Sequence, residues 1–376
     1  MAEDRNGTNR RDILRCLGWA GAGTVWSIGG GVLSSVSLDQ ALAKPAKSSS
    51  FSFVQVSDSH IGFAKPANPD ARVTYREAIA KIRALPQAPD FIVHTGDVSQ
   101  LSRDNEFDDA DQILGEAGLQ TFHVPGEHDM LDDGNGKAFL DRYGKGSAGD
   151  GWFSFDHQGV HFVGLVNVKQ LKAGGMGQLG PDQLAWLKAD LASRRDSTPI
   201  VVFAHIPLWT LYADWGWGTG DAEEATAMLR RFGSVSVLNG HIHQVAQKVE
   251  GQITFHTARS TAFPQPAPGT APAPGPMLVP AEQLRSVLGV RTVQVAPREG
   301  RLALVDLPSP EPHFSRAQHA PSHPGRRAPA RYRPGRRAAD EQPARPTHPR
   351  GRPHRQLHLF AADRHGSGGD HDHLEQ

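Results

Sequence analysis

Five short apolar segments in this chain each end in aspartate, glutamate or histidine, and this pattern constrains the fold more than any other feature. They read FSFVQVSD, DFIVHTGD, TFHVPGEHD, PIVVFAH and VLNGHIH. Their β-branched and aromatic content is typical of buried strands. Segments with helical spacing lie between them, such as residues 71–85, 105–118 and 221–233. Strands that alternate with helices predict an α/β domain with buried strands.

Further elements extend this domain to residue 308. Residues 180–194 predict a helix with proline in its first turn. Hairpins are predicted at residues 151–168, 244–258 and 291–307. The Pro-rich residues 261–290 are predicted to form a surface loop, because strand-like sequence resumes after them. We therefore place a single domain at residues 44–308.

The polar residues at the ends of the five strands form one candidate site. In open α/β sheets, binding sites lie at the carboxyl ends of the strands, so side chains that close several strands should converge there. A single histidine of this kind is more often structural, whereas a whole set favours a shared function. The set consists of Asp58, His60, Asp97, Glu127, His205, His241 and His243.

These residue types indicate a metal centre. Carboxylates and imidazoles without sulfur suit Mn, Fe, Zn or Co, and Cys16 is the single cysteine of the chain. Seven groups can hold two ions if one carboxylate bridges them. Two ions roughly 4 Å apart can clamp a phosphate, activate a water and stabilise the leaving oxygen. The sequence therefore predicts chemistry on phosphate esters.

The order of the motifs DSH, GD, GEHD, H and GHIH is similar to that of the calcineurin-like metallophosphoesterase family, whose pattern is D-x-H, G-D, G-N-H-D/E, H and G-H-x-H. The resemblance covers residues 51–307. The QLAWL segment at residues 183–187 resembles the branch near purple acid phosphatases and class III cyclic nucleotide phosphodiesterases. The family has a four-layer fold, in which helices flank a two-sheet β-sandwich.

The resemblance also implies a role for each residue of the site. Two metal ions, of Fe, Mn or Zn, would be the cofactors. Asp58, His60, Asp97 and His243 would bind one ion, Asp97 would bridge, and His205 and His241 would bind the other. A metal-bound hydroxide would attack phosphorus. His128 would protonate the leaving group of a small-molecule phosphate ester, and Asp129 would orient His128.

Glu127 departs from this pattern, because the family usually has asparagine at its position. An ionised glutamate binds a metal through its charge but donates no hydrogen bond to a substrate. Its charge would also repel a phosphate dianion, so we expect phosphodiesters to be preferred over monoesters. The alternative is a catalytically weakened metal-binding or phosphate-sensing protein of the same fold.

Aromatic residues are crowded into the segment after His205. Trp209, Tyr212, Trp215 and Trp217 could line a wall for a flat or apolar substrate group. The alternative, given equal weight, is that they pack this loop onto the domain. His94, just before the TGD motif, is a further candidate as a hydrogen-bond partner of the site.

Residues 1–43 resemble a twin-arginine export signal. Arg10 and Arg11 precede a mildly apolar, Gly-rich stretch, and the segment ends at Ala41-Leu42-Ala43. This predicts export through the twin-arginine machinery to the periplasm or beyond, with no stable membrane span after cleavage. An uncleaved anchor or a misplaced start are the alternatives, although the apolar stretch is weak for a spanning helix.

Residues 309–376 differ from the rest of the chain in composition. They are rich in Arg, Pro and His and lack apolar periodicity, which predicts disorder or a frameshift product. Binding of nucleic acid through this tail is a third hypothesis. The chain as a whole carries 40 basic and 40 acidic residues, so its net charge gives no argument for a specific nucleic-acid partner.

Overall fold

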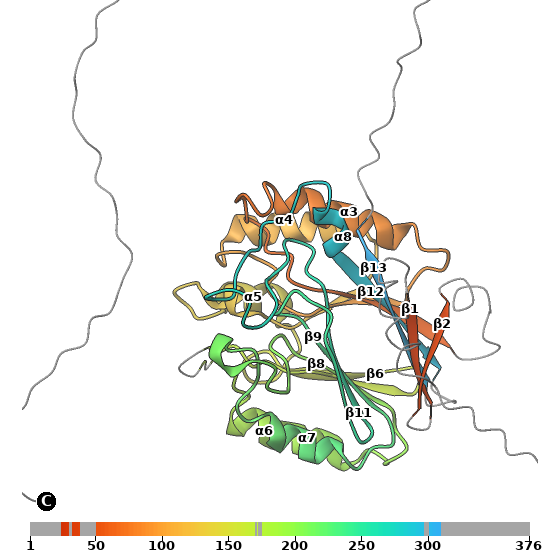
Figure 1. Ribbon diagram of the computed structural model, residues 1–376. Coiled ribbons are helices and arrows are strands. Elements are labelled where there is room, and N and C mark those ends of the chain that lie inside the picture. The colour runs from red at the N-terminus through yellow and green to blue at the C-terminus, as the bar shows by residue number, and fades with distance from the viewer. Residues whose placement is uncertain are drawn as a thin grey trace, which may run out of the picture. The chain divides into compact units, whose positions relative to one another are not determined.

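Two β-sheets face each other in the computed structural model, which describes residues 24–29, 32–37, 50–169, 171, 175–296 and 301–309. The first sheet has the order β2-β1-β13-β12-β3-β4-β5. Its strands are β1 (Thr24–Gly29), β2 (Val32–Ser37), β3 (Phe51–Val56), β4 (Phe91–His94), β5 (Thr121–His123), β12 (Gly289–Ala296) and β13 (Arg301–Pro308). Figure 1 shows the two sheets with helices on their outer sides.

The second sheet has the order β10-β11-β9-β8-β7-β6. Its strands are β6 (Phe153–His157), β7 (Val160–Gly164), β8 (Ile200–Phe203), β9 (Val235–Asn239), β10 (Gln247–Glu250) and β11 (Ile253–Thr257). The hairpin pairs β6–β7, β10–β11 and β12–β13 are antiparallel, as the sequence predicts.

The core between the sheets follows from the alternation of side chains along each strand. Phe53 of β3 and Phe203 of β8 point into this inner core, where both are fully buried. Their neighbours Val54 and Val202 point to the opposite faces and contact the helices. Because successive side chains in a strand face opposite sides, an almost unbroken apolar run can fill two layers of packing.

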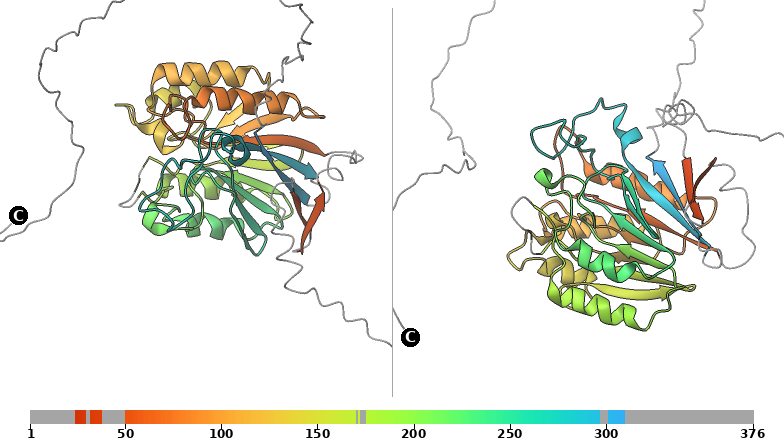
Figure 2. Two further views of the ribbon diagram at one scale, coloured as in Figure 1. Left: turned by 45° about the horizontal axis from the view of Figure 1, so that its top comes forward. Right: turned by 60° about the horizontal axis from the view of Figure 1, so that its bottom comes forward.

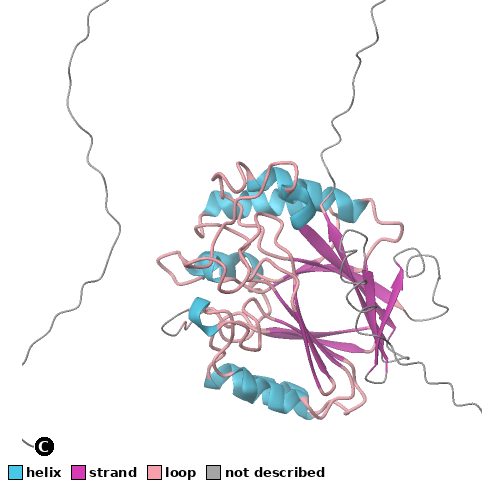
Figure 3. Ribbon diagram, in the orientation of Figure 1, coloured by secondary structure: helices cyan, strands magenta, loops and turns pink. Residues whose placement is uncertain are grey.

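Helices cover both outer faces. The helices α3 (Ala71–Arg83) and α4 (Asp104–Gly115) pack on the first sheet, and α6 (Pro181–Ala192) and α7 (Ala222–Leu229) pack on the second. Figures 2 and 3 show this arrangement from other directions and by element type. The predicted four-layer fold is confirmed.

Parallel strands bring the predicted ligands to one edge. The strands β3, β4 and β5 run parallel in the first sheet, and β7, β8 and β9 run parallel in the second. The short 3₁₀ helix η1 (Glu127–Met130) follows β5, so residues 127–129 also lie at this edge.

Some elements were not predicted from the sequence. The helix α5 (Lys137–Tyr143) begins after Gly136, which has a φ of 91°, and the Asp132 carboxylate accepts a hydrogen bond from the Ala138 N–H at 2.9 Å. The Pro-rich residues 261–290 contain the short helix α8 (Leu284–Val287), and β12 begins at Gly289 near their end. A second 3₁₀ turn, η2 (Ala213–Trp215), lies in the aromatic segment.

The two terminal segments are described in part. The strands β1 and β2 lie within the predicted export signal, and β1 pairs with β13. The other residues of that signal, and residues 310–376 of the tail, lie outside the described part, so both assignments stay predictions. No helix among the described residues has the length and apolar character needed to cross a membrane.

Candidate metal centre

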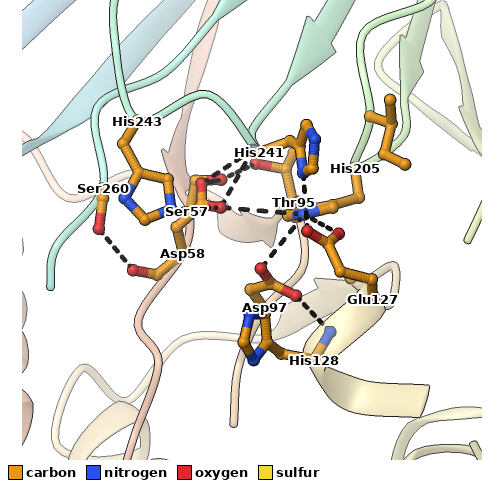
Figure 4. Close-up of polar contacts among 12 residues, drawn as sticks. Ser57, Asp58, Thr95, Asp97, Glu127, His128, His205, His241, His243 and Ser260 are labelled. Atoms are coloured by element: carbon orange, nitrogen blue, oxygen red, sulfur yellow. Dashed lines mark hydrogen bonds and ion pairs between the residues drawn. The ribbon is translucent and has the colours of Figure 1, made fainter. Parts of the chain in front are cut away.

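The seven predicted ligands come together at the shared edge, in two groups with Asp97 between them. Figure 4 labels six of them: Asp58, Asp97, Glu127, His205, His241 and His243. In the first group, His243 Nε2 lies 3.3 Å from Asp58 Oδ1 and 3.2 Å from His60 Nε2. In the second group, Glu127 places one carboxylate oxygen 2.9 Å from His205 Nε2 and the other 2.9 Å from His241 Nδ1. The ligand atoms of each group lie within 4.8 Å of one another.

Asp97 lies between the two groups. Its Oδ2 is 3.5 Å from His60 Nε2 in the first group and 3.4 Å from His205 Nε2 in the second. Its other oxygen accepts a hydrogen bond from the His128 N–H at 2.9 Å. Asp97 therefore has the position of a bridging carboxylate.

The histidines are oriented as metal ligands. The His205 Nδ1–H donates to the Thr95 carbonyl at 2.7 Å, and the His243 Nδ1–H donates to the Phe263 carbonyl at 2.6 Å. A carbonyl can only accept, so the Nε2 lone pair of each ring is left for a cation. His205 Nε2 and both ring nitrogens of His241 are buried without a hydrogen bond. The donor set thus fits two transition-metal ions.

Backbone strain is concentrated in the same residues. Few non-glycine residues adopt a positive φ, and strained residues cluster at functional sites. Five of the eight non-glycine residues with positive φ in the described part are predicted ligands, namely Asp58, His60, Asp97, His241 and His243. Gly126 is required for a related reason, since a Cβ there would lie 2.0 Å from Asp97 Oδ1.

The electrostatics of Glu127, Asp58 and His60 favour the protonation states that a metal needs. In contrast, burial lowers the pKa of His205, but the carboxylates of Asp97 and Glu127 outweigh it and raise that pKa well above its usual value. Burial would raise the pKa of Glu127, but His241 and His205 hold that pKa well below its usual range. Burial likewise opposes ionisation of Asp58, and His243 outweighs it, so the pKa of Asp58 is lowered. Burial lowers the pKa of His60 to about 3. Ionised carboxylates and a neutral imidazole are the forms that bind metal.

His128 lies beside the first group, with its ring centroid 4.8 Å from that of His60. Its Nδ1–H donates to the Gln100 carbonyl at 2.7 Å, which leaves Nε2 free to meet a substrate. Burial lowers the pKa of His128, but the charges of Asp97 and Glu127 outweigh it and raise that pKa above its usual value. The placement suits a proton donor.

Asp129 does not contact the His128 ring, although the sequence predicted that it would orient it. Its carboxylate is fully buried and accepts from the Ser99 hydroxyl at 2.8 Å. It also accepts from three backbone N–H groups, those of Val98, Ser99 and Gly126. Asp129 therefore joins the loops that carry Asp97 and His128, while Gln100 orients the ring.

The aromatic segment after His205 is mostly buried. Trp217 is 1% exposed and packs against Trp215 at 5.1 Å between ring centroids, in one cluster with Ile242. Trp209 is buried against Phe255 at 5.4 Å. A buried ring offers little surface for stacking on a substrate, so the burial of the three tryptophans favours the packing alternative, and the substrate wall stays a prediction. Tyr212 is partly exposed.

One supporting residue, Phe263, carried no signal that could be read from the sequence, whereas His94 was a candidate. The Phe263 ring lies 4.7 Å from His60 and 4.6 Å from His243, yet it belongs to the Pro-rich loop. His94, considered from its place before the TGD motif, makes a 2.7 Å hydrogen bond with Ser59 between two ligands. The contact between Phe263 and His60 joins segments about 200 residues apart, so local spacing does not reveal it.

Comparisons with known proteins identify the family of this chain. The sequence model of the family described as "Calcineurin-like phosphoesterase" matches residues 51–245. The glycerophosphodiester phosphodiesterase GpdQ of Enterobacter lignolyticus is 26% identical over 208 residues, which is 52% of this chain and 71% of that protein.

Two solved structures are also similar. A dimetal phosphatase from Danio rerio has 17% identity and a TM-score of 0.48, over 65% of this chain and 95% of that one. The purple acid phosphatase PPD1 from yellow lupin has 12% identity and a TM-score of 0.47, over 73% of this chain and 65% of that one. Because the family match spans more than half of the sequence, the chain belongs to the calcineurin-like phosphoesterase family and is a metal-dependent phosphoric ester hydrolase.

Proposed function

We propose that this protein is an exported two-metal phosphodiesterase that prefers diesters to monoesters. The observation that carries the preference is the position of Glu127, whose two carboxylate oxygens face His205 and His241. Glu127 therefore lies against the second metal group, where the family usually has a neutral asparagine.

The charge of Glu127 changes what the centre attracts. Asp58, Asp97 and Glu127 supply three negative charges, so two divalent ions leave a single net positive charge at the centre. A phosphomonoester carries up to two negative charges at neutral pH, with a second pKa of about 6, whereas a diester carries one. A glutamate in place of asparagine therefore weakens the attraction for a monoester more than for a diester.

The protein's own groups then act on the bound ester. Two bound ions would supply an activated water and neutralise charge on the phosphate. His128, held through Nδ1, presents Nε2 to protonate the leaving alkoxide. The proposed mechanism therefore assigns the leaving-group side of the site to His128.

Two further points support the proposal. The relative from Enterobacter lignolyticus is itself named as a phosphodiesterase. The paired Arg10 and Arg11 suit the twin-arginine route, which exports proteins that are already folded. This route would let a metal enzyme bind its ions before export. The periplasm, or the space outside the cell, is the proposed location.

Substitution of Glu127 tests the diester preference. We expect both Glu127→Asn and Glu127→Gln to raise kcat/KM for p-nitrophenyl phosphate relative to bis-p-nitrophenyl phosphate by about tenfold, equivalent to about 1.4 kcal/mol. Glu127→Asp keeps the charge and serves as the matched control, with a ratio near that of the wild type. An unchanged ratio in both neutral variants would remove the charge argument.

A further inference from the structure

Four buried polar side chains connect the C-terminal hairpin to the metal ligand Asp58. They start at Arg291 on β12, which is the register partner of Gln55 on β3. Each of the four is 0% exposed, as is Asp58 itself. They are Arg291, Gln55, Thr95 and Ser57.

Hydrogen bonds join these residues in sequence. The Arg291 guanidinium donates to Gln55 Oε1 at 3.4 Å, and Gln55 Nε2 donates to Thr95 Oγ1 at 3.1 Å. Thr95 Oγ1 donates to Ser57 Oγ at 2.7 Å, and the Ser57 hydroxyl donates to Asp58 Oδ2. We call this series the Arg291–Asp58 path.

The two ends of the path fix the direction of every donor. A guanidinium can only donate and an ionised carboxylate can only accept. The Ser57 proton must therefore point at Asp58, which leaves Ser57 Oγ to accept from Thr95. The Gln55 amide must then direct its oxygen at Arg291 and its nitrogen at Thr95. Aligned hydrogen bonds of this kind strengthen one another in a buried setting.

The direction of these hydrogen bonds decides which oxygen of Asp58 can bind a metal. Ser57 donates to Oδ2, while Oδ1 accepts a hydrogen bond from the His241 N–H at 3.0 Å and faces His243 Nε2 at 3.3 Å and His205 Nε2 at 3.9 Å. We propose that the Arg291–Asp58 path turns the Asp58 carboxylate so that Oδ1, and not Oδ2, is presented to the metal. This makes Ser57, Thr95, Gln55 and Arg291 positioning residues of the centre. The inference rests on the proposed two-metal function.

Two neighbouring features support the path. A Cβ at Gly240 would lie 2.1 Å from Ser57 Oγ, so the glycine of the GHIH motif leaves the room that this hydroxyl needs. Asp306 pairs with Arg291 at 2.8 and 3.0 Å, and the Thr257 carbonyl accepts a further bond at 2.9 Å. A buried charge is tolerated when it is paired and hydrogen-bonded in this way.

Substitutions at Thr95 test the path with matched variants. Thr95→Val keeps the side-chain volume but removes the hydroxyl, whereas Thr95→Ser keeps the hydroxyl. Metal-free full-length protein would be titrated with Mn²⁺ and followed by electron paramagnetic resonance, which gives the number of ions bound and the affinity of each. We expect Thr95→Val to bind one of its two ions at least tenfold more weakly than the wild type, and Thr95→Ser to bind within about twofold of it.

The outcomes separate this inference from the proposed function. If the wild type binds two ions and Thr95→Val binds them as Thr95→Ser does, the path has no role in positioning. If the wild type binds no Mn²⁺, the two-metal function itself fails. Should Thr95→Val not fold, Ser57→Ala removes the last link and is expected to show the same loss.

The far end of the path is tested by Gln55→Leu, which removes the link to Arg291. We expect a smaller loss of affinity in the same direction. Wild-type affinity in Gln55→Leu, together with a loss in Thr95→Val, would end the path at Thr95 and overturn the assignment of Arg291.

Discussion

The role of His128 as an acid depends on how Gln100 holds its ring. The Gln100 carbonyl holds its Nδ1–H at 2.7 Å, and the Ser102 hydroxyl holds its backbone carbonyl at 2.8 Å. Its Nε2 is therefore the nitrogen available to a leaving group. Protonation of the leaving group matters most when the departing alkoxide is a strong base.

We predict that His128→Gln slows hydrolysis of alkyl diesters far more than hydrolysis of nitrophenyl diesters. The expected loss in kcat for an alkyl leaving group is about 10²–10⁴-fold, because p-nitrophenolate leaves without a proton. Steady-state kinetics on a series of leaving groups would measure it. Equal losses across the series would show that His128 acts on something other than the leaving group.

His256 on β11 gives a pH dependence that is separate from the metal ligands. Its side chain is buried, neither ring nitrogen has a hydrogen-bond partner, and burial together with Arg291 lowers its pKa to about 3. The folded state therefore keeps His256 neutral, while the unfolded state takes up a proton below its usual pKa of about 6.5. Stability that is present in full above pH 6.5 is lost as the pH falls.

We predict that His256→Leu flattens this dependence. Between pH 6.5 and 5, the free energy of unfolding of the wild type should fall by about 2 kcal/mol more than that of the variant. Urea denaturation at both pH values measures the difference, and the remaining titrating groups cancel. If the free energy of unfolding changed equally with pH in the two proteins, His256 would not be buried in a neutral form.

The loop after β8 supports the metal centre by packing. Trp215 and Trp217 contact Ile242, which lies between His241 and His243, and Ile242 is 1% exposed. The left-handed backbone of both histidines, with φ of 69° and 55°, requires surroundings that hold it in place. This loop is therefore expected to act on stability and metal binding.

We predict that Trp217→Ala lowers the free energy of unfolding by about 3–5 kcal/mol, the usual loss for a buried large side chain. Metal affinity should fall with it, because the turn that carries His241 loses its support. Tyr212→Ala removes a partly exposed ring and serves as the comparison. It should lower the free energy of unfolding by less. A raised KM for aromatic diesters with unchanged stability would instead favour a substrate wall.

At the scale of helices and strands, the sequence predicted the strands and the positions of the ligands, because an apolar run that ends in Asp or His is a local pattern. The helix α5 was not, since its start depends on Asp132 and on the left-handed Gly136. The bonds of Asp129 to Val98 and Ser99 cross about 30 residues, so the motif could not show that it anchors a loop. Similarly, the burial of Trp217 depends on a distant partner and not on the composition of its loop.

At the scale of the whole molecule, the C-terminal hairpin belongs to the functional unit. The family match ends at residue 245, yet β12 and β13 lie within the first sheet, and β12 places Arg291 within hydrogen-bonding distance of Gln55 on β3. The position of Arg291 opposite Gln55 is set by strand register, which the sequence alone did not reveal.

We predict that Arg10 and Arg11 direct export. Replacement of both by lysine should keep the protein in the cytoplasm, because the twin-arginine machinery reads the arginine pair as an address. Cell fractionation with immunoblotting measures this, and replacement of Arg5 alone is the control. Normal export of the double variant would show that export does not depend on the arginine pair.

Metal-dependent turnover tests the central claim most directly. Full-length protein, stripped of metal, would be titrated with Mn²⁺ while bound metal and hydrolysis of bis-p-nitrophenyl phosphate are measured together. We predict two ions per chain, with activity that rises as the second ion binds. Two bound ions without turnover, with any of Mn, Fe, Zn or Co, would contradict the enzymatic account and favour a metal-binding or phosphate-sensing protein.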